Sequence, residues 1–286
     1  MNPTTLFSAY YGLRRAAFLL VLALSAQAVT ATAQTIIVQD SFTLNGTSRV
    51  AGGSLAPTSP EQQVGGNVWK TASGIASGVF TAGGAITTKQ NNYPTEMRIG
   101  IAQPSTEVTV SASIVVGNAA FTAIGFLTTD NGTTSSWLAT GSSADSALWV
   151  YITPTGSWNI YINGTTTKIS SGSISGFSAS STYTLGLTYV PDTQMARAFL
   201  VDSGGTETSL YASNGGWFAS GVAATSIAAT GFRIHSIAST TTGSPVVDDF
   251  LVASTSTIPE PSSVALLAGG IILAMVVGRR RILRRA

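Results

Sequence analysis

Between residues 34 and 256 the chain consists of short segments in which apolar and polar side chains alternate. In residues 107–116 every second side chain is apolar, from Val108 to Ile114, and Ser or Thr lies between them. Residues 181–190 repeat this pattern. Successive side chains of a strand point to opposite faces, so a period of two predicts β-strands with one buried face.

Turn signals separate these segments. Residues 147–152 and 158–162 flank Thr153-Pro154-Thr155-Gly156, and Asn163-Gly164 leads into residues 165–169. Both sequences predict tight hairpins. Further strands are expected at residues 35–42, 67–71, 78–81, 120–128, 195–202, 231–235 and 246–253.

About a dozen short strands without helical periodicity predict an all-β sandwich or barrel. Charged residues make up only 9% of the chain, against 44% hydrophobic residues. This composition argues against disorder, which needs high charge. The chain has no cysteine, which excludes cysteine zinc sites, iron–sulfur clusters and cysteine nucleophiles.

The basic residues lie mainly at the two ends of the chain. Two arginines precede an apolar run near the N-terminus, and five lie within the last eight residues. Between residues 34 and 258 seven basic and eleven acidic residues remain, which gives a net charge of −4. The overall basic balance therefore reflects membrane topology, and we expect no nucleic-acid partner.

The N-terminus has the order of a secretory signal. Arg14 and Arg15 are followed by the apolar run 16–24 and then by small residues. We interpret residues 1–33 as a signal helix that signal peptidase removes after Ala28 or Ala33. A retained membrane anchor is the alternative, but the run is about half the length that spans a bilayer.

The C-terminus combines three features in a fixed order. Pro259-Glu260-Pro261 comes first, and an apolar stretch at 264–277 follows it. This stretch predicts a short transmembrane helix whose cytoplasmic end is fixed by arginines. These arginines are Arg279, Arg280, Arg281, Arg284 and Arg285.

Residues 257–286 resemble the PEP-CTERM sorting signal of Gram-negative bacteria. The resemblance implies that the membrane enzyme exosortase recognises the tail. It also implies an inner-membrane intermediate, followed by release to the cell surface or an extracellular polysaccharide matrix. A plain membrane anchor is the alternative reading of the tail.

Residues 34–256 form the exported domain. The segment Asp40-Ser41-Phe42 opens it, Val247–Val252 closes it, and Trp158–Gly164 lies beside an L-W-V-Y-I strand. These segments resemble the concanavalin/laminin-G-like jelly-roll sandwich. That fold implies that the first and last strands pair, but it serves lectins, hydrolases and adhesive modules alike.

The sequence offers no recognisable catalytic set. Hydrolases of this fold carry an E-x-D-x-x-E strand, which is absent here, and the glutamates are scattered. Asp248 and Asp249 are adjacent in a predicted strand and should face opposite ways. His235 is the only histidine, without a G-x-S-x-G elbow. We therefore expect a non-enzymatic protein.

Calcium and sugar are the ligands that remain to be considered. Calcium needs only oxygen ligands, and pairing of the terminal strands would bring Asp40 near Asp248 and Asp249. The alternative is that these are solvated aspartates at strand edges. No other cofactor is expected. Trp137 and Trp217 lie in loop-like sequence and are candidates to stack on sugar rings, whereas Trp149 and Trp158 are expected in the core.

These observations predict an exported surface or matrix protein that binds exopolysaccharide without catalysis. Two alternatives stay open. One is a secreted carbohydrate-active hydrolase with an unrecognised site, for which Glu107 and Asp249 are the residues to test. The other is a self-associating adhesive protein.

Overall fold

The computed structural model describes residues 32–71, 75–88, 94–131, 145–163, 168–237 and 244–257. Within these ranges the chain forms β-strands, turns and two 3-10 turns, η1 (Asn214–Gly216) and η2 (Ala224–Ser226), and contains no α-helix. Residues Gln34–Thr255 form one compact unit. The signal helix and the transmembrane helix expected from the sequence lie outside the described residues.

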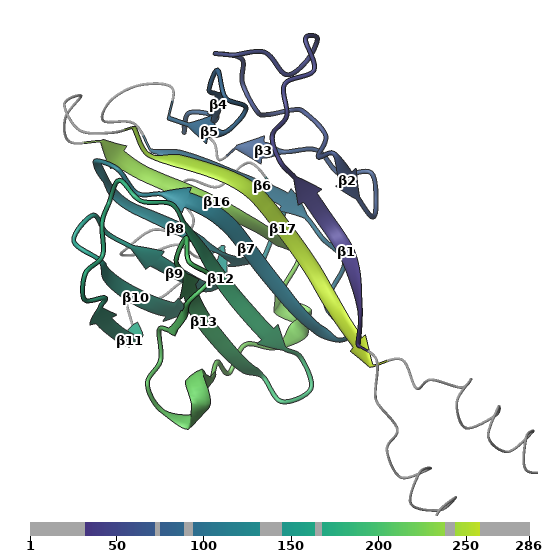
Figure 1. Ribbon diagram of the computed structural model, residues 1–286. Helices are drawn as coiled ribbons and strands as arrows, with labels where there is room; N and C mark the ends of the chain where they lie inside the picture. The colour runs from purple at the N-terminus through teal and green to yellow at the C-terminus, as the bar shows by residue number, and fades with distance from the viewer. Residues whose placement is uncertain are drawn as a thin grey trace, which may run out of the picture. The chain divides into compact units, whose positions relative to one another are not determined.

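Ten strands form the first sheet (Figure 1). Its main path runs through β14 (Glu207–Ser209), β13 (Met195–Val201), β12 (Tyr183–Val190), β7 (Glu107–Val115), β17 (Val246–Thr257), β1 (Thr32–Asp40) and β2 (Gln62–Gln63). Three short strands lie off this path: β15 (Trp217–Ala219), β4 (Val79–Phe80) and β5 (Ile86–Thr87).

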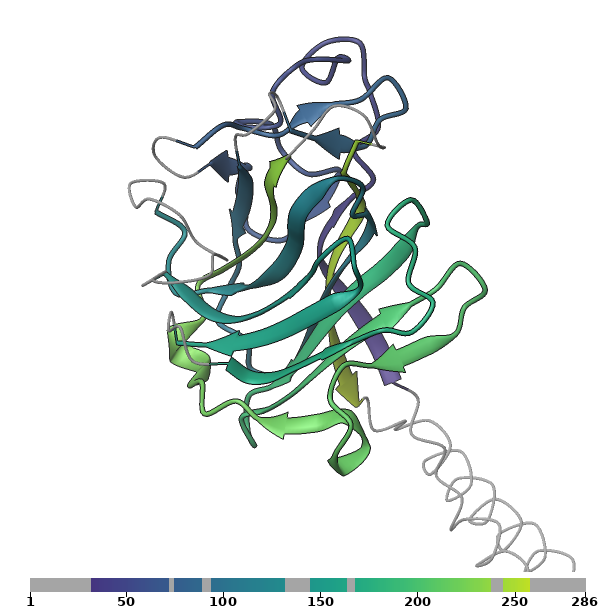
Figure 2. The same ribbon diagram turned by 90° about the vertical axis from the view of Figure 1, so that its left-hand side faces the viewer.

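Seven strands form the second sheet, and they are curved rather than flat (Figure 2). Their order is β11 (Lys168–Ser173), β10 (Ser157–Ile162), β9 (Ser146–Ile152), β8 (Ala119–Leu127), β16 (Ala229–Ile237), β6 (Thr95–Gly100) and β3 (Lys70–Thr71). Every pairing recorded between these strands is antiparallel.

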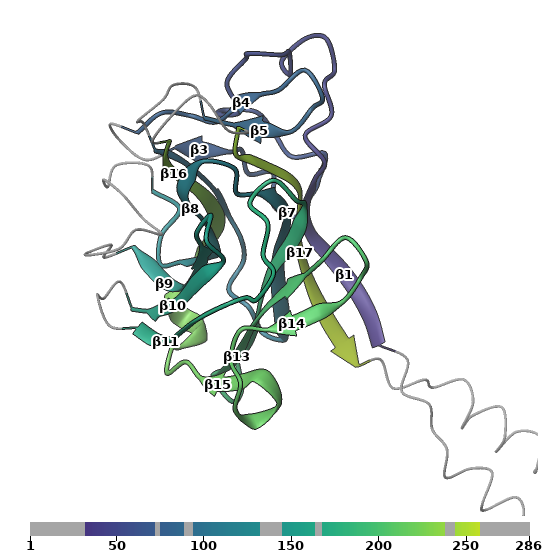
Figure 3. The same cartoon turned by 60° about the vertical axis from the view of Figure 1, so that its left-hand side comes forward.

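The two sheets pack face to face around one core (Figure 3). β7 buries every second residue, from Val108 to Ile114, and leaves the residues between them partly exposed. These side chains share a core cluster with Ile124 of β8 and Val150 of β9 in the other sheet. The alternating pattern therefore places one face of each sheet inside, which confirms the predicted jelly-roll β-sandwich.

The first and last long strands lie side by side. β1 and β17 are neighbours in the first sheet, and β1 begins where β17 ends (Figures 1 and 3). The expected pairing of the terminal strands is confirmed. The hairpin of β9 and β10 across 153–156 is confirmed. β10 also pairs with the next strand, but that strand is Lys168–Ser173 and its first pair is Tyr161–Lys168, so it begins later than the predicted 165–169.

The last strand differs from the prediction in two ways. It extends beyond the predicted 246–253, because the polar residues 254–257 continue β17, where Ser254 pairs with Val108 and Thr255 with Glu107. The alternation expected at Asp248 and Asp249 is interrupted by a β-bulge between Asp248 and Leu251. Asp249 takes a positive φ of 46° there. A bulge leaves one residue outside the ladder, so neighbouring side chains need not alternate.

Within the described residues, no helix is both long and apolar enough to cross a bilayer.

Candidate functional site

The outer face of the seven-stranded sheet carries two rows of side chains that the strand register lines up. One row crosses five strands as Tyr161, Trp149, Gly125, Gly231 and Arg98. The next row crosses the same strands as Asn159, Tyr151, Ala123, Arg233 and Glu96. The outward face of an antiparallel sheet is normally polar and solvated. Bulky aromatic residues on this face therefore need an explanation.

The aromatic residues on this face stack on one another. Trp149 and Tyr161 lie 4.6 Å apart at an interplanar angle of 14°. Phe121 stacks on Tyr151 at 4.7 Å and on His235 at 4.6 Å. We call these five residues the aromatic face. Trp149, Tyr161 and Phe121 are buried, whereas Tyr151 and His235 are partly exposed.

Tyr151 and Asn159 add polar groups to the aromatic face. The Asn159 side-chain amide donates a hydrogen bond of 2.6 Å to the Tyr151 hydroxyl. Burial, followed by the neighbouring Tyr161, raises the pKa of Tyr151 to about 12. The phenol therefore stays protonated at neutral pH and keeps a hydrogen-bonding hydroxyl beside the rings.

Charged residues occupy the other half of the same outer face. Arg233 forms an ion pair with Glu96, and both side chains are buried. Burial lowers the pKa of Arg233, and Glu96 opposes that effect. Arg98 is buried too and donates to the Thr129 carbonyl at 3.1 Å. Burial lowers its pKa, against the charges of Asp145, Asp130 and Glu96.

His235 joins the aromatic and charged halves. Its Nδ1 lies 2.6 Å from Nη2 of Arg233, which is always a donor, so Nδ1 accepts and Nε2 carries the proton. Burial, followed by the charge of Arg233, lowers the pKa of His235 to about 4. The imidazole is neutral at physiological pH and belongs to a stacked, hydrogen-bonded network.

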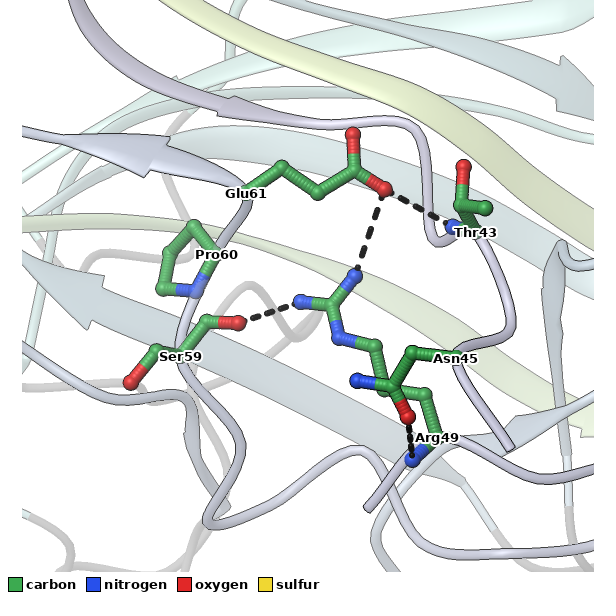
Figure 4. Close-up of a pocket in the computed structure, with 6 residues that line it drawn as sticks. All are labelled: Thr43, Asn45, Arg49, Ser59, Pro60 and Glu61. Carbon is green, nitrogen blue, oxygen red and sulfur yellow. Dashed lines mark hydrogen bonds and ion pairs between the residues drawn. The ribbon is translucent and has the colours of Figure 1, made fainter. Parts of the chain in front are cut away.

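A hollow lies where the loop after β1 meets β2. It has a volume of about 410 Å³, and Figure 4 shows the six residues that line it. Arg49 is buried there and donates to both carboxylate oxygens of Asp40, at 2.6 and 2.7 Å, and to the Ser59 carbonyl. Glu61 lies 3.5 Å from the same guanidinium and accepts from the Thr43 amide at 2.9 Å.

We call Asp40, Arg49 and Glu61 the Arg49 clasp. Burial acts to raise the pKa of Glu61, but hydrogen bonds from Ser41 and Thr43 outweigh it and leave the pKa below its usual value. These charged groups satisfy one another and tie the loop to the strands on either side. The clasp therefore explains stability better than ligand binding.

The structure brings the proposed calcium ligands near one another but gives Asp40 another partner. Both oxygens of Asp40 hold Arg49, and one also accepts from Trp69 Nε1 at 2.7 Å. Burial raises the pKa of Asp248, and the charges of Asp249, Asp40 and Glu61 add to this. Within the described ranges, no group of three metal-ligating side chains was found. Calcium binding stays a prediction that this geometry does not favour.

The tryptophans divide as follows. Trp149 and Trp158 are buried, as expected, but Trp149 belongs to the outer aromatic face rather than to the core between the sheets. Trp217 is partly exposed and pairs with Arg197 in the ten-stranded sheet, so it lies away from the aromatic face. Trp137 lies outside the described residues, as do Pro259, Glu260, Pro261 and the C-terminal arginines.

Sequence reasoning missed the charged half of this face. Glu96 and Arg98 lie on β6, which was not predicted although its side chains alternate between buried-core apolar residues and charged ones. Arg233 alternates in the same way with Phe232 and Ile234. An arginine or glutamate at a strand position between core residues is therefore the signal that could have located this face.

Comparisons with known proteins identify the tail. Residues 257–281 match the family described as the PEP-CTERM protein-sorting motif. The motif marks an exported protein that is sorted to the cell surface. A search of curated proteins found no match to the chain.

Several solved structures are similar to this chain in backbone shape. Lectin II from Ulex europaeus is 15% identical, with a TM-score of 0.46 over 66% of this chain and 92% of its own. A winged bean acidic lectin complexed with methyl-alpha-D-galactose is 10% identical, with a TM-score of 0.46 over 79% and 100%. Peanut lectin is 9% identical, with a TM-score of 0.48 over 80% and 100%.

Proposed function

We propose that this protein is an exported, non-enzymatic surface or matrix protein whose β-sandwich binds polysaccharide on the aromatic face. In this proposal signal peptidase and exosortase process the two ends, and an inner-membrane intermediate precedes release. The exopolysaccharide of the producing cell is the partner.

The aromatic face is the observation that carries the proposal. Sugar rings have apolar C–H faces and polar hydroxyl edges, and aromatic side chains with polar tips suit both. On this face Tyr151 and His235 are partly exposed, and the Asn159 amide donates a hydrogen bond to the Tyr151 hydroxyl. An apolar, aromatic cluster on the face of the sheet that points away from the core supports a binding role, because the outward face of a sandwich is normally polar.

The pairing of the carboxylates supports binding without catalysis. A retaining glycosidase needs two carboxylates about 5.5 Å apart as acid and nucleophile. Glu96 is held by Arg233, and Asp130 accepts from Lys70 at 2.7 Å. Glu107 and Asp249, the residues considered for a hydrolase, belong to the ten-stranded sheet. Because Glu96 and Asp130 are both ion-paired, their role is better explained as stabilising the structure of this face.

Retention of the full-length chain on immobilised polysaccharides tests this proposal. We expect Tyr151→Ala to weaken retention at least tenfold, because it removes a partly exposed ring and its hydroxyl. Trp217→Ala is the matched control, since it removes a partly exposed aromatic residue from the other sheet. Loss of retention in Trp217→Ala alone would place the site elsewhere, and a chain retained by no polysaccharide would refute the proposal.

A further inference from the structure

We infer that Trp149 and Asn159 form a donor–acceptor pair that selects a hydroxyl group of a neutral sugar ring. This inference rests on the proposed function, because it specifies the ligand chemistry of the same aromatic face. It assigns two specificity-determining residues and excludes acidic sugars as the preferred ligand.

The observation behind it is that two buried polar atoms lack partners. Trp149 is fully buried and Asn159 is 8% exposed. Trp149 Nε1 and Asn159 Oδ1 make no hydrogen bond with the chain. Buried donors and acceptors are nearly always paired, because an unpaired one keeps its full desolvation cost. A bound group that satisfies both atoms would remove that cost.

The neighbouring residues fix both atoms in place. Asn159 donates through its amide nitrogen to Tyr151, so its remaining polar atom is the acceptor Oδ1. Trp149 stacks on Tyr161, which holds the indole plane. Register places Asn159 opposite Tyr151 and Trp149 opposite Tyr161 on adjacent strands. Trp149 and Asn159 are therefore diagonal neighbours on one face of two adjacent strands, and such neighbours lie about 7–8 Å apart.

The pair specifies the chemistry of its ligand. An indole N–H only donates and an amide oxygen only accepts, whereas a hydroxyl does both. A sugar ring, with hydroxyls on adjacent carbons, can accept from Trp149 and donate to Asn159. A carboxylate or sulfate could satisfy the donor but not the acceptor.

The charges on the face also favour a neutral ligand. Arg233 pairs with Glu96, Lys70 pairs with Asp130, and Arg98 lies within the field of three carboxylates. An anionic ligand would have to compete with these carboxylates for each cation. Recognition of an acidic sugar usually relies on charge-assisted hydrogen bonds from arginine. Here Arg233 pairs with Glu96 and Arg98 donates to the Thr129 carbonyl.

The test uses the full-length chain with dextran and galactan as neutral probes and alginate as the acidic probe. We expect the unmodified chain to bind a neutral probe more tightly than alginate. Trp149→Phe keeps an aromatic ring but removes the N–H donor together with the pyrrole part of the indole, and it should weaken neutral binding about tenfold. Asn159→Leu removes the acceptor and should weaken it similarly. Trp158→Phe, the same change on the inner face, should leave affinity unchanged.

Thermal unfolding separates this role from a structural one. Trp149→Phe and Trp158→Phe each shrink a buried side chain, so both should lower the melting temperature by similar amounts, whereas only Trp149→Phe should lower affinity. Unchanged neutral binding in both Trp149→Phe and Asn159→Leu would mean that the pair holds only water, and would overturn the inference while the proposed function stands. Tighter binding to alginate would also overturn it. No binding to any probe would refute the proposed function itself.

Discussion

Asp40 concentrates several interactions at the end of β1. Its carboxylate accepts from the Arg49 guanidinium, from Trp69 Nε1 and from the Phe42 amide at 2.9 Å. Trp69 in turn packs against Phe250 of β17 at 5.2 Å between ring centroids. One buried carboxylate therefore orients both the loop that follows β1 and a central ring of the core.

Asp40→Asn should destabilise the protein by about 3–5 kcal/mol, because it leaves the buried Arg49 guanidinium without its main counter-charge. Urea unfolding followed by tryptophan fluorescence measures this. Lys70→Met is the control: it breaks the Lys70–Asp130 pair, whose two side chains are 37% and 44% exposed, and should cost less than about 1 kcal/mol. Equal losses in the two variants would contradict the role assigned to the clasp.

His235 should make stability depend on pH. Its pKa is about 4 in the folded protein, against 6.5 as the ordinary value. Between these values the unfolded chain binds a proton that the folded chain does not, so stability falls as the pH decreases from about 6.5 to about 4. His235→Gln should flatten this part of the stability curve. An NMR titration that showed the imidazole protonating near pH 6.5 would contradict the prediction.

At the scale of strands, most of the correct predictions came from the alternation of apolar and polar side chains. β7 and β12 were predicted correctly because their Ser and Thr residues alternate with buried aliphatic residues. β6 was missed, since Glu96 and Arg98 hide the alternation of Met97 and Ile99. The buried charge of Glu96 is offset by Arg233 of β16, and Arg98 donates to the Thr129 carbonyl in the segment after β8. The sequence of β6 alone does not show that another strand supplies a partner for its charged residues.

The aromatic face could not be predicted from local sequence for a related reason. Trp149 was expected in the core because it alternates with aliphatic neighbours, and it is in fact buried. Which of the two sheet faces Trp149 and Tyr161 occupy depends on the register of β8, β9 and β10. Register is a property of several strands together.

Close contact between β8 and β9 should make Gly125 irreplaceable. A methyl group there would lie 2.5 Å from both the Leu148 carbonyl oxygen and Trp149 Cβ. Gly125→Ala should therefore cost about 1–3 kcal/mol, as overpacking usually does. Gly83→Ala is the control, because its nearest neighbour would be Thr81 Oγ1 at 3.8 Å. Urea unfolding measures the free energy of unfolding of both variants. Equal values would contradict the prediction and show that β8 can shift to accept the methyl group.

At the scale of the whole sandwich, the two ends of the compact unit meet at one place. β1 begins beside the end of β17 (Figure 1), and adjacent strands lie about 4.8 Å apart. The first residue of β1 and the last residues of β17 therefore lie at the same end of the sandwich.

A circular permutant tests this arrangement. If Thr255 is joined to Gln34 by a short Gly-Ser linker and the chain is opened at the exposed turn between β12 and β13, the protein should fold with a loss of no more than about 2 kcal/mol. Opening the chain inside β8 should prevent folding, because that strand pairs with neighbours on both sides. Circular dichroism and urea unfolding report both results. Failure of the first permutant would contradict the placement of the ends.

The direct passage from β17 into the sorting tail has a mechanical consequence. β17 is an interior strand, held by β7 on one side and β1 on the other, and the matched tail starts at its last residue. A force applied to the end of β17 along the strand axis would load the hydrogen bonds to both neighbours together, in shear. Such a force would have to break these bonds nearly at once, instead of opening them one after another, before the strand could leave the sheet.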